Sequence, residues 1–232
     1  MGPAGEVRPM TEIQQSAPAP AISDRSARKR SVVLAAATEL FLRHGYLGTS
    51  MDQVASTAGV SKPTVYKFFA DKDRLLGEIV LGTLDRAGDP FRSELASLAA
   101  TDDVGTDLRR LARQYLATVM QPAVLQLRRL VIGASHQLPD LAQAYYDRAP
   151  QRTIRALAEL FRQLADRGLL AVDDPLTAAA QFAFLVVGRA VDKSLFYGDE
   201  PFSEAELAAQ ADAGAAAFLA AYASAPAQRR GS

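Results

Sequence analysis

Apolar residues recur every three or four positions along most of this chain, which is the spacing of one face of an α-helix. Near the N-terminal end, Val33, Ala37, Leu40 and Phe41 fall on one side of a helix expected over residues 26–44. Further apolar stripes and capping residues predict the next helices, over residues 51–58, 62–69 and 72–87, the last of them capped by Asp71. The first third of the chain is therefore expected to be helical.

The helical pattern continues beyond residue 88, with breaks at prolines, glycines and paired aspartates. One of these breaks is expected at Ala149-Pro150. Asp174 before Pro175 predicts a capped helix start, and Ser203 with Glu206 predicts a capping box after a loop at 198–201. The segments predicted as helices are 91–99, 104–120, 123–137, 141–148, 151–167, 175–195 and 204–222.

Composition supports an all-α fold. Hydrophobic residues make up 49% of the 232 residues, and many are Ala and Leu, which are strong helix formers. That length is enough for one large or two small domains. We predict a disordered tail over 1–24, one domain over 25–80, a second helical domain over 81–223 and a flexible tail over 224–232.

Residues 50–69 predict a helix, a tight turn and a second helix. Ser50 with Gln53 three residues later forms a capping box, and Gly59 can take the left-handed conformation that ends the first helix. Ser61 can cap the second helix, and Pro63 lies in its first turn, where a missing N–H costs little. This arrangement is a helix-turn-helix, whose second helix usually enters the major groove of DNA.

The segment GYLGTSMDQVASTAGVSKPTVYKFFADKDRLL, residues 45–76, resembles the DNA-binding domain of TetR-type (TetR/AcrR family) transcriptional regulators. The resemblance covers residues 26–80 and includes the Thr-Ser helix start, Ala-Gly-Val-Ser, Val-Tyr-x-x-Phe and Lys-x-x-Leu. The later segment RRLVIGASHQLPDLAQAYYDRAP is similar to one C-terminal subgroup of that family. The resemblance implies a homodimer, a palindromic operator in double-stranded DNA, and a small-molecule effector cavity in the C-terminal domain.

The second helix of the motif carries side chains suited to DNA. Lys62 and Thr64 lie at its N-terminal end, where a lysine can reach guanine O6 and N7 and a threonine can offer a hydroxyl or a methyl group. Tyr66 and Lys67 are expected to contact phosphates, and Ser61 can cap the helix or also touch a phosphate. These residues predict both base reading and backbone contacts.

Other candidates flank this helix. Thr49 and Ser50 can present backbone N–H groups to a phosphate at a helix start, and Lys72 can grip another phosphate. The basic run before the first helix can follow the DNA backbone or enter the minor groove. The full set of candidate DNA contacts is Arg28, Lys29, Arg30, Thr49, Ser50, Ser61, Lys62, Thr64, Tyr66, Lys67 and Lys72.

Several of these residues have a plainer interpretation. Tyr66 can be a core residue with a satisfied hydroxyl, Lys72 can be merely solvated, and the run at 28–30 can be a solvated face. Phe68 stands where many relatives of the family carry a histidine, so a phosphate contact from that position is in doubt.

Two long segments, 151–167 and 175–195, are the candidates for dimerisation. Both carry large apolar residues interspersed with small ones, which lets helices approach closely, and two copies would make a four-helix interface. The alternative is that both helices are interior to one subunit.

The effector cavity is expected to be mostly apolar with a few polar anchors, which suits a hydrophobic or aromatic ligand. Each candidate wall residue can equally be ordinary core, and Arg128 and Arg129 can pair with a ligand carboxylate or bridge helices. The candidate wall residues are Tyr115, Met120, Leu127, Val131, His136, Tyr145, Tyr146, Phe182 and Phe184.

Catalytic and metal-binding patterns are missing from the sequence. It has no Cys and only two His, and it contains no HExxH, Gly-x-Ser-x-Gly or Walker sequence. No cofactor, metal site, membrane span or signal peptide is therefore expected, and a cytoplasmic regulator that is not an enzyme fits best. Two alternatives stay open: a DNA-organising protein without an effector and, less favoured, a helical enzyme.

Overall fold

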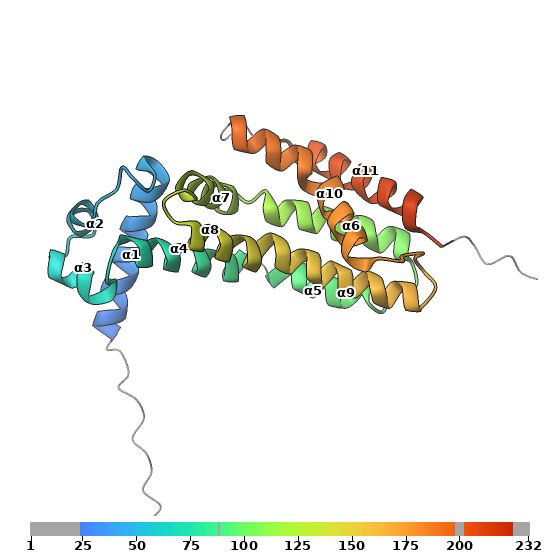
Figure 1. Cartoon of the computed structure of the whole chain (residues 1–232), viewed down its shortest axis with the longest axis horizontal. Coiled ribbons are helices and arrows are strands. Elements are labelled where there is room, and N and C mark those ends of the chain that lie inside the picture. Colours follow the sequence, from blue (N-terminus) through green and yellow to red (C-terminus); the bar gives the residue numbers. More distant parts are fainter. Residues whose placement is uncertain (1–23, 88, 198–201, 225–232) are drawn as a thin grey trace, which may run out of the picture.

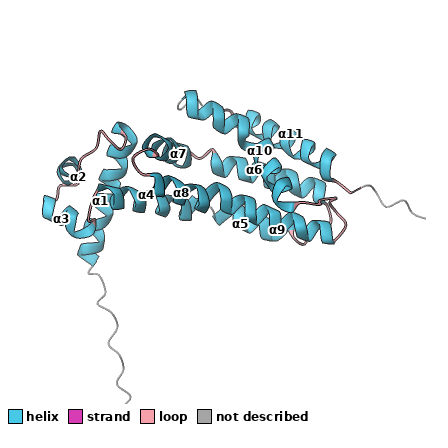
Figure 2. Ribbon diagram, in the orientation of Figure 1, coloured by secondary structure: helices cyan, strands magenta, loops and turns pink. Residues whose placement is uncertain are grey.

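The computed structural model describes residues 24–87, 89–197 and 202–224, and these residues form helices and no strand (Figures 1 and 2). The all-α prediction is therefore confirmed. The elements are α1 (Asp24–His44), α2 (Met51–Thr57), α3 (Lys62–Phe68), α4 (Lys72–Ala87), α5 (Asp89–Leu98), α6 (Val104–Val119), α7 (Pro122–Ala134), α8 (Pro139–Tyr146), the π-helical turn η1 (Asp147–Gln151), α9 (Arg152–Asp166), α10 (Pro175–Tyr197) and α11 (Glu204–Tyr222).

Most predicted helix starts are capped as expected. The Ser50 hydroxyl accepts from the Gln53 N–H at 3.2 Å, and the Ser203–Glu206 box also forms. The Asp71 carboxylate accepts from the Arg74 N–H at 2.7 Å at the start of α4. The prediction for Ser61 is wrong, because its hydroxyl lies 2.8 Å from the Thr64 hydroxyl and makes no side-chain cap to the backbone.

The predicted break at Ala149-Pro150 is also wrong. The chain continues from α8 into α9 through η1, and Figure 1 shows α8 and α9 following one another as one rod. Pro150 lies inside this π turn. A π turn widens the helix locally and so accommodates a residue that has no N–H to donate.

The core of the N-terminal part crosses the domain boundary proposed at residue 80. Phe41, Val54 and Val65 of α1–α3 are fully buried, and they belong to one cluster with Leu127 of α7 and Tyr145 of α8. Helix α4 runs from this cluster to residue 87 in the body of the molecule. The helix-turn-helix therefore rests directly on the C-terminal half.

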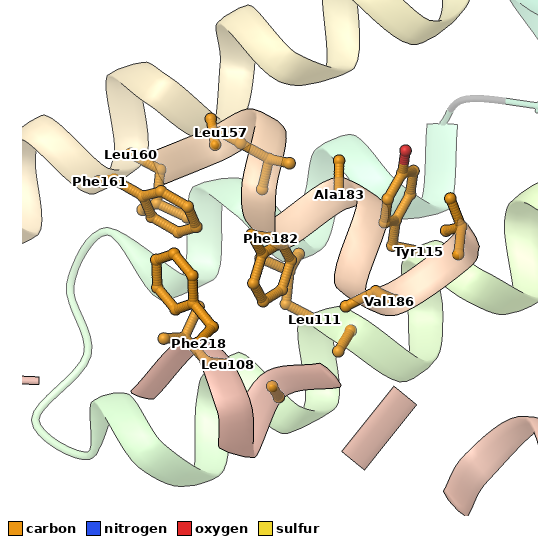
Figure 3. Close-up of a cluster of buried hydrophobic side chains, with 14 of the residues drawn as sticks. Leu108, Leu111, Tyr115, Leu157, Leu160, Phe161, Phe182, Ala183, Val186 and Phe218 are labelled. Carbon is orange, nitrogen blue, oxygen red and sulfur yellow. The ribbon is translucent and has the colours of Figure 1, made fainter. Parts of the chain in front are cut away.

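The core of the C-terminal part centres on three phenylalanines from three helices (Figure 3). Phe161 of α9 stacks on Phe218 of α11 with ring centroids 4.7 Å apart, and Phe182 of α10 meets both rings edge-on. All three side chains are fully buried, and Leu108 and Leu111 of α6 surround them. Burial on this scale holds α6, α9, α10 and α11 together.

Helices α10 and α11 approach closely at Gly214. A Cβ atom there would lie 2.8 Å from the carbonyl oxygen of Leu185, so only a glycine fits without a backbone shift. The two tails proposed for 1–24 and 224–232 fall outside the described residues except for Asp24, which begins α1, and Ser224; the loop proposed at 198–201 also falls outside them.

Candidate nucleic-acid interface and C-terminal cavity

The turn between α2 and α3 has the geometry that the sequence predicts. Gly59 has φ of +63°, the left-handed conformation that ends a helix, and Pro63 lies in the first turn of α3. Val65 is fully buried and anchors α3 by its inner face. The opposite face of α3 is left exposed at the end of the molecule (Figure 1).

The outer face of α3 brings together most of the predicted reading residues. Ser61, Lys62, Tyr66 and Lys67 are exposed, and Thr64 is half-buried. Tyr66 is 44% exposed, so it is not the core residue that the plainer interpretation offered. Cations, hydroxyls and an aromatic ring thus share one short surface, which is the chemistry needed for bases and phosphates.

Lys62 has a carboxylate partner in the neighbouring helix. Its Nζ lies 2.8 Å from Oδ1 of Asp52, in the first turn of α2. The hydrogen bond and the negative charge of Asp52 raise the pKa of Lys62 above its ordinary value. Lys62 is therefore charged at neutral pH, and Asp52 fixes the direction in which it points.

Lys72 braces the loop between α1 and α2. Its Nζ donates to the carbonyl oxygens of Tyr46 at 3.0 Å and Thr49 at 3.1 Å, and it lies 4.0 Å from the centroid of the Tyr46 ring. The Tyr46 hydroxyl donates to Asp73, and burial together with this bond raises the pKa of Tyr46 to about 12. Lys72 is thus more than a solvated cation, because it holds the loop before α2 in place.

The predicted phosphate contacts from Thr49 and Ser50 are wrong in the form proposed, because their N–H groups have partners. The Thr49 N–H donates to the Tyr46 carbonyl, its hydroxyl donates to Gly45, and its side chain is only 2% exposed. The Ser50 N–H donates to Gln53 Oε1 at 2.8 Å in the capping box. A motif predicts the helix start, but it does not reveal which donors the cap consumes.

The basic run at the start of α1 divides into two parts. Arg28 and Lys29 are exposed, whereas Arg30 pairs with Glu78 of α4 and lies 5.2 Å over the ring of Phe69. Arg30 therefore ties α1 to α4 and to Phe69, the residue that follows α3, which is a role that the sequence did not predict for it.

A second site lies in the C-terminal part, where a cavity of about 290 Å³ is lined by helices from α4 to α9. Arg128 of α7 donates from Nε to the Tyr145 hydroxyl at 3.3 Å, and Tyr115 is buried beside it. Burial raises the pKa of Tyr115 to about 12, so its phenol stays neutral. The lining residues are Leu84, Asp85, Leu95, Tyr115, Thr118, Val119, Val124, Arg128, Tyr145, Arg148, Ala149, Pro150, Arg152, Thr153 and Ala156.

Tyr115 and Tyr145 are the predicted wall residues that this cavity contains. Leu127 and Val131 belong to the N-terminal core, and Phe182 belongs to the phenylalanine cluster. Outside these cores, Met120 is half-buried, packed against the C-terminal cluster, and His136, Tyr146 and Phe184 are exposed. The prediction that these seven residues line the cavity is therefore wrong. Apolar spacing shows which residues share one face of a helix, but it does not show whether that face packs in a core or lines a cavity.

The two arginines take different roles. Arg128 lines the cavity, and Arg129 bridges helices, since its Nε lies 3.2 Å from the carbonyl oxygen of Ser194 in α10. Arg148 and Arg152 also line the cavity and were not predicted from the sequence. Their spacing of four residues places them on one side of a helix, and this was the available signal.

The two helices proposed for dimerisation, α9 and α10, differ in how far their apolar side chains are buried. In α9, Leu157, Phe161 and Leu164 are fully buried in the subunit's own core, as the alternative interpretation had it. In α10, by contrast, Phe184 and Phe196 are 70% and 81% exposed. The uncovered apolar surface therefore lies on α10.

Comparison with known proteins identifies the class to which this architecture belongs. Residues 33–79 match the family model described as bacterial regulatory proteins of the tetR family. Residues 106–224 match the C-terminal domain of AefR-like transcriptional repressors. The second match covers more than half of the chain, and the first contains the helix-turn-helix.

Solved structures agree over the whole fold. A TetR-family regulator from Mesorhizobium loti has 38% identity and a TM-score of 0.78, with 87% of this chain and 100% of that chain covered. The flavonoid-responsive regulator FrrA has 32% identity and a TM-score of 0.64, with 85% and 98% covered. The DNA-binding transcriptional repressor TetR of Mycobacteroides abscessus is 32% identical over 67% of this chain and 70% of its own length.

The chain belongs to the TetR family of DNA-binding transcriptional regulators. Other curated relatives match over shorter stretches. The chain covers 27% of a regulator from Bacillus subtilis and 38% of the transcriptional activator FasR from Mycolicibacterium smegmatis. None of the helices in the described ranges combines the length and the apolar character needed to span a bilayer.

Proposed function

We propose that this chain binds a palindromic operator as a homodimer, represses transcription, and is released from DNA by a small, mostly hydrophobic effector. The single observation that carries the proposal is that α4 belongs to both sites. Its first residue, Lys72, braces the loop before α2, and Leu84 and Asp85 near its other end line the cavity. These positions are about 18 Å apart along one helix.

A ligand in the cavity would act on α3 through this helix. The rod formed by α8, η1 and α9 offers a second connection, because α8 packs on α4 while η1 and α9 line the cavity. A ligand that binds one position of α4 more tightly than another shifts the population of dimer shapes, and the spacing of the two α3 helices changes with it.

The dimer is proposed to form through α10 with α11 beside it. Leu185 and Phe196 are exposed and lie eleven residues apart, which places them on the same side of α10. Exposed apolar residues gathered on one helix are typical of an interaction surface, and a two-fold axis would let each copy cover the other.

The direction of regulation rests on the relatives. The repressor of M. abscessus matches over most of its length, whereas the match to the activator FasR covers a smaller share. The name of FrrA states that it responds to flavonoids, which supports a small-molecule effector in a cavity of this architecture. Repression with release by an effector is therefore the form we propose.

Selection of bound duplexes from a random DNA pool with the full chain tests this function. We expect an inverted repeat, whose half-sites are about one helical turn or a multiple of it apart. A single unrepeated motif together with a monomer in light scattering would contradict the dimer. Release of the selected duplex by a small molecule would distinguish a regulator from a DNA-organising protein, and failure of every cavity ligand to release it would favour the latter.

A further inference from the structure

The charge of the cavity lining is strongly unbalanced. Three arginines, Arg128, Arg148 and Arg152, line it, and Asp85 is the one carboxylate among the described lining residues. Arg128 is half-buried and lies deeper, whereas Arg148 and Arg152 are exposed at the rim. The lining therefore has an excess of positive charge next to apolar side chains.

These arginines differ from two others in the same half of the molecule, Arg113 and Arg162. Arg113 forms a two-pronged ion pair with Asp212, at 2.7 Å and 2.5 Å, and Arg162 pairs with both Glu159 and Asp166. Within the part of the chain that the structure describes, no ion pair joins Arg128, Arg148 or Arg152 to a carboxylate. Among the described residues, these three guanidinium groups therefore have no ion-pair partner.

The remaining lining divides into an apolar wall and neutral donors. Leu84, Leu95, Val119 and Val124 supply the wall. The hydroxyls of Thr118 and Thr153 also belong to the lining. A ligand would therefore meet both hydrocarbon and hydrogen-bond donors.

The π turn η1 positions two of the three arginines, Arg148 and Arg152, at the cavity. Arg148, Ala149 and Pro150 of η1 all line the cavity, and Arg152 begins α9 directly after the turn. π turns occur often at functional sites because they redirect side chains that a regular helix would point elsewhere. Pro150, which the sequence suggested as a break, thus belongs to the wall of a binding site.

We propose that the cavity binds a small apolar carboxylate, with its hydrocarbon part against the leucines and valines and its anionic end paired with Arg128, Arg148 and Arg152. The inference rests on the proposed role of this cavity as the effector site. The volume of about 290 Å³ suits a ligand of one or two rings or a short acyl chain. A carboxylate matches the planar donor fork of arginine, which binds it in two-pronged geometry.

Calorimetric titration of the full chain with a matched series tests the charge preference. The probes are naphthylacetate, naphthylethanol and naphthylethylammonium, which share one ring system and differ in their end group. The anion is expected to bind about tenfold more tightly than the alcohol, since hydrogen bonds to charged groups are the stronger ones, and the cation is expected to bind least.

Two substitutions on one helix assign the effect to the cavity. Arg152→Gln removes a lining charge, and Arg155→Gln removes an exposed arginine three residues further along α9 that does not line the cavity. Both change the net charge equally, and both sites are exposed, so folding is expected to survive. Naphthylacetate should bind about tenfold more weakly to Arg152→Gln and unchanged to Arg155→Gln.

The outcomes separate the ligand class from the proposed function. Preference for the alcohol or the cation, equal loss in both variants, or binding of none of the probes at millimolar concentration would overturn the carboxylate site. Binding of naphthylacetate that depends on Arg152 supports it. If that binding leaves the affinity for the selected duplex unchanged, the carboxylate site stands and its proposed role in DNA release fails.

Discussion

The two candidate sites of this molecule are built in opposite ways. The α3 surface comes from one seven-residue helix and the turn before it, so its exposed side chains lie within residues 61–67. The cavity draws on residues 84 to 156 and on every element from α4 to α9. The difference teaches that a local motif can place a DNA-reading surface, whereas a ligand site of this kind exists only after the helices have packed.

The largest expected effect is a loss of stability from a substitution in the phenylalanine cluster of the C-terminal core. Phe161→Ala removes a fully buried ring that contacts both Phe182 and Phe218. The free energy of unfolding should fall by roughly 3–5 kcal/mol, because the substitution leaves a cavity among rings that cannot collapse. Urea unfolding followed by circular dichroism measures it. A loss below about 1 kcal/mol would mean that the phenylalanine cluster does not hold the helices together.

The α3 surface can lose a DNA contact without a comparable loss of stability. Lys62→Ala should weaken binding to the selected duplex by about 1–3 kcal/mol and relax base preference at one position of each half-site. Stability should hardly change, since Lys62 is exposed and its pair with Asp52 lies at the surface. Competition binding with single-base variants measures the preference. Uniform weakening across all variants would show that Lys62 contacts phosphate and not a base.

Gly214 offers a test of helix packing in the C-terminal part. Gly214→Ala should lower the free energy of unfolding by about 1–3 kcal/mol, because the new methyl group would overlap the backbone of α10 at Leu185. Gly133→Ala in α7, outside the α10 face proposed for the dimer, is the control. Nothing lies within 4 Å of its Cβ position, so the better helix former should raise stability by roughly 0.5–1 kcal/mol. Equal effects of the two substitutions in thermal unfolding would contradict the close approach.

The smallest effect concerns the cap of α2. Ser50→Ala removes the acceptor of the Gln53 N–H and should cost about 1 kcal/mol of stability. Gln53→Ala removes the other half of the box and should cost no more than that. Chemical denaturation of both variants measures this, and a cost near zero for Ser50→Ala would show that water replaces the cap.

The sequence predicted the parts of the fold that neighbouring residues determine. The left-handed Gly59, the Ser50 capping box and the Asp71 and Asp174 caps each depend on atoms a few residues apart, and each is observed. The reading face of α3 followed because Val65 fixes which side is buried.

Other features depend on partners that are distant in the sequence. Phe182 and Phe184 are two residues apart in one apolar stretch, yet Phe182 is fully buried and Phe184 is 70% exposed. Arg30 contacts Phe69 and Glu78, and the spacing of neighbouring residues does not predict these contacts. The arginines beside Pro150 were overlooked because a proline in that position ordinarily ends a helix.

The central claim is that the exposed face of α3 lies against the phosphates and bases of duplex DNA, and the salt dependence of binding tests it most directly. Fluorescence anisotropy with the selected duplex over a range of salt concentrations gives the slope of log affinity against log salt. We predict a steep slope, which becomes smaller by about one per lost phosphate contact in Lys67→Ala and stays unchanged in Arg155→Ala. Affinity that is insensitive to salt, or the same slope in Lys67→Ala and the wild type, would contradict the account.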